Sequence, residues 1–373
     1  MNETILANDV IQLIEEWAPT RLAYDWDNVG LQVGSLNKPI NKVMVTLDVI
    51  ESVVDEAIDN NVDLIIAHHP LLFSPMKQID TNSVKGKILN KLIKNDITVY
   101  AAHTNLDVAD GGVSDMLADD LGVIDTEVLK PSGSVKLYKL IIYVPETHTE
   151  KLTNAIGDHG AGHIGNYSHC SFQTKGTGAF KPLDGTTPFI GTQNQIEEVK
   201  EVKVETIATE EQLSSLISVV HSTHPYEEPA YDIIPLANQG RTVGVGRIGR
   251  LAKEMSLKEF CSHVKQKLDV PVVRFTGNLN DSVKAVAILG GSGKSYIKEA
   301  IQKGADVYVT GDMTFHEAQD GWQMGLNIVD PGHHVEKVMK SKVKKYLDEK
   351  LSNQNKSLDI IVSKKNTEPF NFI

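Results

Sequence analysis

The sequence predicts an α/β protein in which two pseudo-symmetric α/β halves form one core and a ferredoxin-like α+β domain is inserted between them. The first observation is an internal repeat: residues 42–69 align with residues 284–312 after a single insertion, and each copy reads as strand, helix, strand. The second is that the chain changes its pattern between the two copies. Because a repeat fixes the architecture before any single motif is weighed, we divide the chain into residues 1–126, 127–241 and 242–373.

Length and charge restrict the class of protein. At about 150 residues per domain, 373 residues correspond to two or three domains. The formal net charge of -12 offers no basic field to a phosphate backbone, which disfavours nucleic acid as a partner. Four acidic residues among the first 20 and the absence of a long apolar run predict a protein of the cytoplasm, without a signal peptide or membrane contact. Cys170 and Cys261 lack CxxC spacing, so free thiols are expected.

The first half is predicted to alternate short apolar strands with helices, as in a buried parallel sheet. Its first helix would be capped by Asn8 and stopped by Pro19. The loop around Trp26 that follows is either a turn with an aromatic anchor or part of the lining of a site. Strands are expected at residues 43–47, 64–67 and 97–102, and further helices at residues 51–60, 85–95 and 113–121.

The insert, residues 127–241, has the order strand, helix, strand, strand, helix, strand, which is typical of a ferredoxin-like sandwich. The segment His221 to Asp232 combines histidines and glutamates and could suggest a metal site. Pro225 and Pro229 interrupt it, however, which favours a turn at the entry of a strand. Strands are expected at residues 137–144, 167–175, 197–207 and 231–236, and helices at residues 148–157 and 210–221.

The second half resumes near Thr242, with a helix at residues 257–268, the second repeat copy and a lysine-rich helix at residues 335–351. The segment GGSGKS, which begins at Gly290, is not a Walker motif because the glycine that the motif requires is Ile288. It is therefore either a tight turn or a turn that binds phosphate through its amides.

Four strand ends carry metal-binding residue types. They are His68-His69, residues 103–107, Gly311-Asp312 and residues 333–336. Ligands of a parallel sheet gather outside the carboxyl ends of its strands, so the two halves could pool these side chains in one metal-binding core.

The spacing of these residues favours two ions rather than one. Adjacent residues leaving a strand point in opposite directions, so His68 and His69 suit two neighbouring ions. His333 and Glu336 share one face at i and i+3, and Asp107 adds a second carboxylate. A single strand-end histidine is more often bound by backbone, but five compatible residues at related positions of a repeat predict a dinuclear site for zinc, manganese or iron.

Three further polar residues lie at or beside the same strand ends: His103, Asp312 and His316. A ligating histidine needs an acceptor for its second ring nitrogen, so these residues are candidates for that support or for proton transfer. For His316, a polar residue on a helix face is the alternative.

With these strand ends, the sequence resembles the Nif-three-like family, also labelled dinuclear-metal-centre proteins or GTP cyclohydrolase I type 2 homologues. The resemblance covers the whole chain through WDNVGLQVG, HHP, HTNLD, GDMTFHEA, GHHVEK and, in the insert, HPYEEPAYD, as in the long bacterial members. It implies the metal ligands His68, His69, Asp107, His333 and Glu336. Many members have three residues between the last histidine and glutamate, whereas this chain has two, so His334 stays open as an alternative to His333.

The resemblance also implies an assembly and a range of functions. It implies two divalent ions per chain, zinc first, and a toroidal homohexamer, a dimer of trimers, whose insert resembles trimer-forming signalling and copper-tolerance domains. The expected function is a metal-dependent hydrolase acting on a nucleotide-like or phosphorylated small molecule, with GTP ring opening as the family's version. A metal-dependent ligand sensor, a metal carrier or a ring-shaped scaffold are the alternatives, and the physiological substrate is left open.

Overall fold

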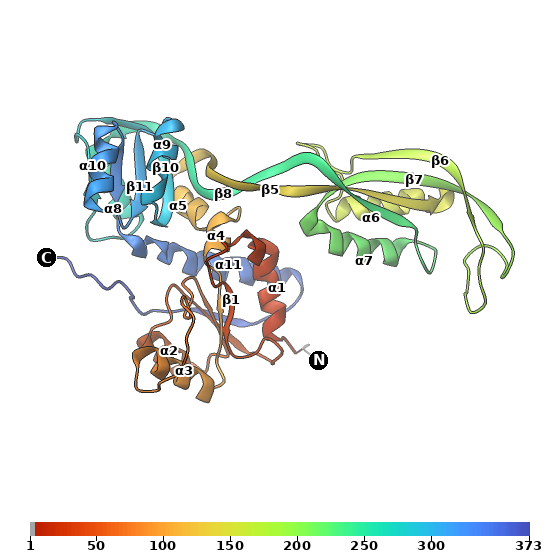
Figure 1. Cartoon of the computed structure of the whole chain (residues 1–373), viewed down its shortest axis with the longest axis horizontal. Coiled ribbons are helices and arrows are strands. Elements are labelled where there is room, and N and C mark those ends of the chain that lie inside the picture. Colours follow the sequence, from red (N-terminus) through yellow and green to blue (C-terminus); the bar gives the residue numbers. More distant parts are fainter. Residues whose placement is uncertain (1–3) are drawn as a thin grey trace. The chain divides into compact units, whose positions relative to one another are not determined.

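The computed structural model describes residues 4–373, which form two compact units (Figure 1). The first contains the described residues up to Ser132 together with Val243–Ile373, and the second is Gly133–Thr242. Each mixes helices and strands, which confirms the predicted α/β class. Among the described residues, every helix is too short or too polar to cross a membrane.

The first sheet of the first unit contains β1 (Gly30–Val33), β2 (Lys42–Thr46), β3 (Leu64–Ala67), β4 (Thr98–Ala101) and β13 (Asp359–Val362). Their order is β1-β4-β3-β2-β13, and all are parallel to their neighbours except β1, which is antiparallel to β4. Helices α2 (Glu51–Asp59) and α3 (Val84–Lys94) close a core around Ile65 and Val99. The sheet therefore has the buried parallel centre that its aliphatic strands predict.

The second half contributes β8 (Tyr231–Ser256), β9 (Arg274–Phe275), β10 (Ser282–Ser292), β11 (Val307–Gly311) and β12 (Asn327–Asp330). Their order is β8-β10-β11-β12-β9; β10, β11 and β12 are parallel, and the two outer strands are antiparallel. Helices α8 (Leu257–Lys267), α9 (Ile297–Gln302) and α10 (Phe315–Gln323) connect them.

The repeat is visible in the backbone hydrogen bonds of both halves. Asp63, just before β3, accepts the amides of Asn41 and Lys42 at 2.7 and 3.0 Å. Asp306, just before β11, accepts the amides of Lys284 and Ala285 at 2.9 and 2.7 Å. The aligned aspartates therefore hold the same two strands together in each copy.

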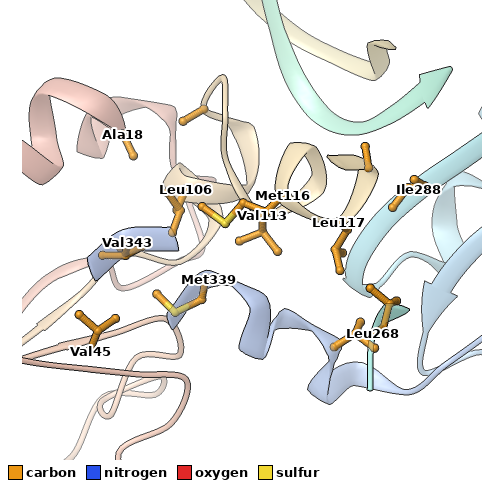
Figure 2. Close-up of a cluster of buried hydrophobic side chains, with 14 of the residues drawn as sticks. Ala18, Val45, Leu106, Val113, Met116, Leu117, Leu268, Ile288, Met339 and Val343 are labelled. Atoms are coloured by element: carbon orange, nitrogen blue, oxygen red, sulfur yellow. The ribbon is translucent and has the colours of Figure 1, made fainter. Parts of the chain in front are cut away.

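The two halves share one apolar core around α5 (Val113–Leu121) and α11 (Val338–Asn353). Figure 2 shows Met339 and Val343 of α11 close to Val113 of α5, with Val45 from the first sheet and Ile288 from the second in the same cluster. All five side chains are at most 1% exposed. Each such side chain contributes roughly 1.5–3 kcal/mol on burial, so this core fixes the two halves against each other.

The second unit contains most of β5 (Val123–Pro145), then α6 (Thr149–Asp158), β6 (Ser171–Phe180), β7 (Glu197–Thr209), α7 (Leu213–Thr223) and the start of β8. The strand order is β6-β7-β5-β8, and both helices pack on a core that includes Leu140, Val204 and Leu216 (Figure 1). The element order is the predicted one, while the assignment as an inserted ferredoxin-like domain at residues 127–241 stays a prediction.

Some local expectations need correction. Asn8 is not the cap of α1 (Ala7–Trp17): the N-cap is Leu6, two residues earlier, and Asp9 accepts the amide of Leu6 at 2.8 Å. The loop after Trp26 contains β1, which was not expected. The residues of β13, placed with the second half by the sequence, pair with β2 of the first sheet.

Candidate metal centre

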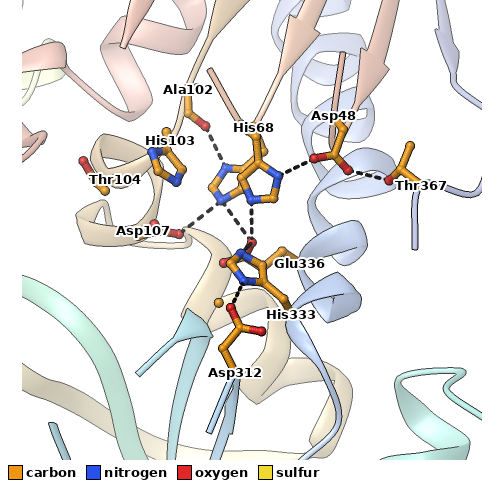
Figure 3. Close-up of polar contacts among 12 residues, drawn as sticks. Asp48, His68, Ala102, His103, Thr104, Asp107, Asp312, His333, Glu336 and Thr367 are labelled. Carbon is orange, nitrogen blue, oxygen red and sulfur yellow. Dashed lines mark hydrogen bonds and ion pairs between the residues drawn. The ribbon is translucent and has the colours of Figure 1, made fainter. Parts of the chain in front are cut away.

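Strand ends from both halves converge on one polar cluster inside the first unit (Figure 3). His68 and His69 follow β3, and their amides bond to Thr46 and Leu47 at 3.2 and 2.9 Å, so the backbone continues beside β2. This extended backbone turns the two imidazoles apart, with ring centroids 5.2 Å from each other. From the other half, His333 and Glu336 come from the 3-10 helix His333–Lys337 that follows β12.

Glu336 is the centre of the cluster. Its Oε2 lies 3.0 Å from His69 Nε2, 3.1 Å from His333 Nε2 and 3.7 Å from His68 Nε2, and the residue is only 3% exposed. Asp107, from helix α4 (Thr104–Val108), places Oδ1 3.6 Å from His68 Nε2. One buried carboxylate therefore faces three imidazoles, with a second carboxylate beside them.

Each of the three imidazoles has its other nitrogen bound to an acceptor. His68 Nδ1 lies 2.8 Å from the carbonyl oxygen of Ala102, and His69 Nδ1 lies 2.6 Å from Asp48 Oδ1. His333 Nδ1 lies 2.7 Å from Asp312 Oδ2. An acceptor at Nδ1 keeps a proton there, so the lone pair of a neutral ring is on Nε2 and points into the cluster, as in histidine ligands of metals.

Two buried atoms in the cluster have no hydrogen-bond partner among the described residues: His68 Nε2 and Asp107 Oδ1. A buried polar atom without a partner costs about 1–3 kcal/mol, so a third group between them would stabilise the site. Imidazole nitrogen and carboxylate oxygen are the donors that zinc, manganese and iron accept. The residues present therefore fit a metal ion.

Three overlapping groups of side chains have donor atoms within 4.8 Å of one another and could hold a metal ion. The first is His68, Asp107 and Glu336, and the second is His69, His333 and Glu336. Glu336 belongs to both. The third group is His68, His69 and His103.

The charges of the cluster balance one another without a metal. Burial lowers the pKa of His69, but hydrogen bonds to Asp48 and Glu336 outweigh it and raise that pKa to about 10. His333 behaves in the same way, with a pKa raised to about 9. Burial raises the pKa of Asp107 to about 6, whereas imidazoles hold the pKa of Glu336 well below its usual range despite its burial. Glu336 is therefore the permanent anion of the cluster.

Two further carboxylates fix the orientation of histidines. Asp27 accepts hydrogen bonds from His103 Nδ1 at 2.9 Å and from the amide of Thr104 at 3.1 Å. Burial opposes ionisation of Asp27, but these bonds lower its pKa to about 2. Asp48, which binds His69, in turn accepts the hydroxyl of Thr367 near the C-terminus.

A cavity of about 540 Å³ opens onto the cluster. His69, His333 and Glu336 line its polar wall, and its other lining residues include four aromatic side chains: Tyr24, Trp26, Phe73 and Tyr296. The backbone at Gly291 forms part of the wall, with φ 62°, and a Cβ there would lie 2.6 Å from Glu336 Oε1. The GGSGKS segment thus approaches the cluster as a glycine turn.

The five predicted ligands lie together in the cluster. His333 and His334, between which the sequence left the ligand role open, have different surroundings. His333 faces Glu336, whereas His334 Nε2 is buried without a hydrogen-bond partner among the described residues and belongs to none of the three groups. His316 lies exposed at the start of α10, where its ring contacts Phe315, and is also outside these groups. In the second unit, the histidine of the HPYEEP segment, His224, binds the carbonyl of Tyr143 at 2.9 Å within a turn.

Sequence reasoning missed three residues of the site: Asp27, Asp48 and Thr367. Asp48 follows the end of β2, so the rule that located the histidines could have found it. Asp27 belongs to the loop that was considered as a lining of the site. Thr367 is 319 residues from Asp48, and no local pattern indicates the contact.

Comparison with known proteins agrees with the predicted resemblance. A family model described as Duf34/NIF3 (NGG1p interacting factor 3) matches residues 5–369. The chain is 52% identical over 364 residues to the GTP cyclohydrolase 1 type 2 homolog of Halalkalibacterium halodurans, with 98% of each chain covered. It is 50% identical over 373 residues to the protein of the same name from Bacillus subtilis, with 100% of each covered. A Bacillus cereus protein related to NIF3 superposes with a TM-score of 0.91 at 50% identity over the full length of both chains. The chain therefore belongs to the Duf34/NIF3 family.

Proposed function

We propose that this protein binds two divalent metal ions and hydrolyses a nucleotide-like or phosphorylated small molecule. His68, Asp107 and Glu336 hold one ion, and His69, His333 and Glu336 hold the other. The observation that carries the proposal is the carboxylate of Glu336, which faces imidazoles of both groups. Zinc is our first choice of ion because the donors are mainly imidazoles, with manganese or iron as alternatives.

When bound, the two metal ions would supply Lewis acidity, which polarises a phosphoryl or carbon centre and makes water more acidic. The chain's own residues supply orientation and proton transfer. His103 is held through Nδ1 by Asp27, which leaves its Nε2 free to take a proton from water or give one to a leaving group. Asp48 and Asp312 keep two further imidazoles in the orientation that presents Nε2.

The names of the relatives add one candidate reaction. A GTP cyclohydrolase opens the imidazole ring of a guanine base, which also requires water to attack an electrophilic centre. The same residues could serve attack on that carbon or on phosphorus, so both reactions belong in the test.

The test is turnover of a panel of GTP, other nucleotides and simple phosphoesters by protein loaded with zinc or manganese, followed by chromatography. We expect turnover by the native protein, its loss in His68→Ala, and its retention in the matched control His316→Ala, since His316 lies outside the cluster. Full activity in His68→Ala would contradict the proposal. No turnover by the native protein, combined with ligand-dependent thermal stabilisation, would favour a ligand sensor.

We also propose that the chain assembles as a homohexamer, a dimer of trimers, through Gly133–Thr242. Among the described residues, strand β6 ends the strand order of that unit and pairs with β7 alone, so its outer edge offers backbone groups to another chain. Light scattering should give six times the chain mass of 41.0 kDa. A monomer at micromolar concentration would contradict this.

Both cysteines are free, which agrees with the reducing cytoplasm that we propose as the location.

A further inference from the structure

We propose that the rim of the cavity sets the direction in which substrate binds: a nucleobase stacks on Trp26 and Phe73, and the phosphate points inward to the metal centre. The substrate class is then a nucleoside monophosphate cleaved at its phosphate ester, rather than a nucleotide whose base is opened. This inference rests on the proposed function, because it takes the cluster to be a hydrolytic metal centre.

The rim is aromatic and exposed. Trp26 is 60% and Phe73 is 52% exposed, although both are large apolar side chains beside a polar cavity. Their ring centroids are 5.9 Å apart at an interplanar angle of 57°, and Tyr24 stacks on Trp26 at 5.8 Å. Tyr24 also bonds to the hydroxyl of Tyr296 at 3.2 Å, which ties the rim to the second half. Exposed aromatic surface at the mouth of a site indicates a ligand with an apolar or aromatic part.

One histidine ring separates this rim from the metal centre. The ring of His103 lies 6.2 Å from that of Trp26 and 6.5 Å from that of Phe73. On its other side it lies 5.2 Å from the ring of His68 and 5.6 Å from that of His69. In a nucleotide, a single sugar separates the base from the phosphate. A base on the rim can therefore place its phosphate at the cluster, with the sugar passing His103.

The charges of the residues that line the cavity distinguish two directions of binding, with either the phosphate or the base of the nucleotide toward the metal centre. None of the described residues that line it is lysine or arginine, and three of them, Asp48, Asp107 and Glu336, are carboxylic acids. A base placed against the metals would leave its phosphates at the aromatic rim with no cation to neutralise them. Positive charge in this cavity would come from the cluster alone, from its histidines or from metal ions held there, so the phosphate belongs beside the cluster. Because the described lining residues include no lysine or arginine, a nucleoside monophosphate is favoured over a triphosphate as the substrate.

The reaction that follows is hydrolysis of a phosphate monoester. A water oxygen forms a bond to phosphorus, the bond between phosphorus and the sugar oxygen breaks, and the electron pair of that bond leaves with the sugar oxygen. The proton lost by the water is balanced by one gained by the sugar oxygen, for which His103 Nε2 is our candidate donor because its Nδ1 is held by Asp27. The products are a nucleoside and inorganic phosphate, and no oxidant or other reactant is needed.

The test compares GMP with methyl phosphate, which lacks a base, in metal-loaded native protein, Trp26→Ala and Trp26→Phe. Stacking on an aromatic side chain is typically worth about tenfold or more in affinity. We expect Trp26→Ala to raise KM for GMP by about tenfold with kcat retained, Trp26→Phe to restore most of the loss, and methyl phosphate to be unaffected. An equal loss with both substrates, or formate released from GTP in place of phosphate from GMP, would overturn the inference.

A binding experiment separates this inference from the proposed function. GMP should quench the fluorescence of metal-loaded native protein and of Trp322→Phe, a control at a tryptophan that is 58% exposed and outside this cavity, but not of Trp26→Phe. If no substrate turns over and the quenching is present, the hydrolase proposal fails and the rim is a base-binding site. If turnover is present and quenching is absent, the rim assignment fails alone.

Discussion

The two copies of the internal repeat share a scaffold but supply different chemistry. The shared part is an aspartate before the second strand, Asp63 in one copy and Asp306 in the other, which binds two amides at the start of the first strand. This function depends only on backbone groups, which both copies contain. The aspartate therefore has the same position and the same two bonds in each.

The strand ends of the two copies differ. Strand β3 leads into His68 and His69, which point Nε2 toward Glu336. Strand β11 leads into Asp312, whose backbone is left-handed with φ 54° and whose carboxylate binds Nδ1 of His333. One copy thus contributes donor atoms directly, and the other holds a donor that comes from a later segment. The scaffold of this repeat is therefore set by its backbone, while the side chains at its edges take different roles.

The largest effect is expected at the residue that joins the two halves. In Glu336→Gln both groups lose their shared carboxylate, so metal content should fall from two ions per chain to less than one, and affinity by at least about 100-fold. Metal analysis after dialysis measures this, with Glu349→Gln on the exposed face of α11 as the control. If Glu336→Gln keeps one tightly bound ion, the carboxylate is not shared.

Smaller losses of metal are expected when only one of the two ligand groups loses a donor. His68→Ala and His333→Ala should each leave one ion per chain, because each removes a donor from a different group. His334→Ala is the control for the second, since its ring is outside both groups. A full metal load in His333→Ala, together with a loss in His334→Ala, would transfer the ligand role to His334.

The scaffold positions should change stability without changing metal content. Asp63→Ala and Asp306→Ala each leave two backbone amides without an acceptor, so each should lower the free energy of unfolding by about 1–3 kcal/mol. Chemical denaturation measures this, with the exposed Asp59→Ala as the control. A large change in only one of the two would show that the copies are not equivalent in their scaffold.

The smallest effect is expected at Thr367, which is linked to His69 of the metal centre through Asp48. Thr367→Val removes the hydroxyl bound to Asp48 and should weaken metal binding by a few-fold, less than the 10- to 100-fold typical of a direct partner of a ligand. Thr367→Ser should restore the affinity. Identical binding constants for the native protein and Thr367→Val in competition with a chelator would exclude any positioning role.

Much of the fold followed from local patterns. The aliphatic strands around Leu64 and Val307 and the α5 helix were placed closely because buried parallel strands and amphipathic helices leave strong signals. Strand β13 was missed because its pairing with β2 joins residues more than 300 positions apart, which no window of sequence reveals. The cap of α1 was misplaced by two residues, since the N-cap is Leu6 and the first amides of the helix bond to the carbonyls of Lys38 and Leu36 from a distant segment.

The site was predicted to the extent that strand topology determines it. Parallel strands place their carboxyl ends at one edge, so His68, His69 and Asp107 could be expected together. The choice between His333 and His334 could not be made, because it depends on the turn at Gly332, whose φ is 89°. Asp27 and Thr367 depend on packing between distant segments.

We expect Glu336 to be shared between two ions, each of them held by side chains from both halves of the chain. Crystals grown with Mn²⁺ and measured with anomalous scattering test it directly. We predict two peaks about 3.5–4 Å apart, one beside His68 and Asp107 and the other beside His69 and His333, with Glu336 contacting both. A single peak, or two peaks of which only one contacts Glu336, would contradict the account.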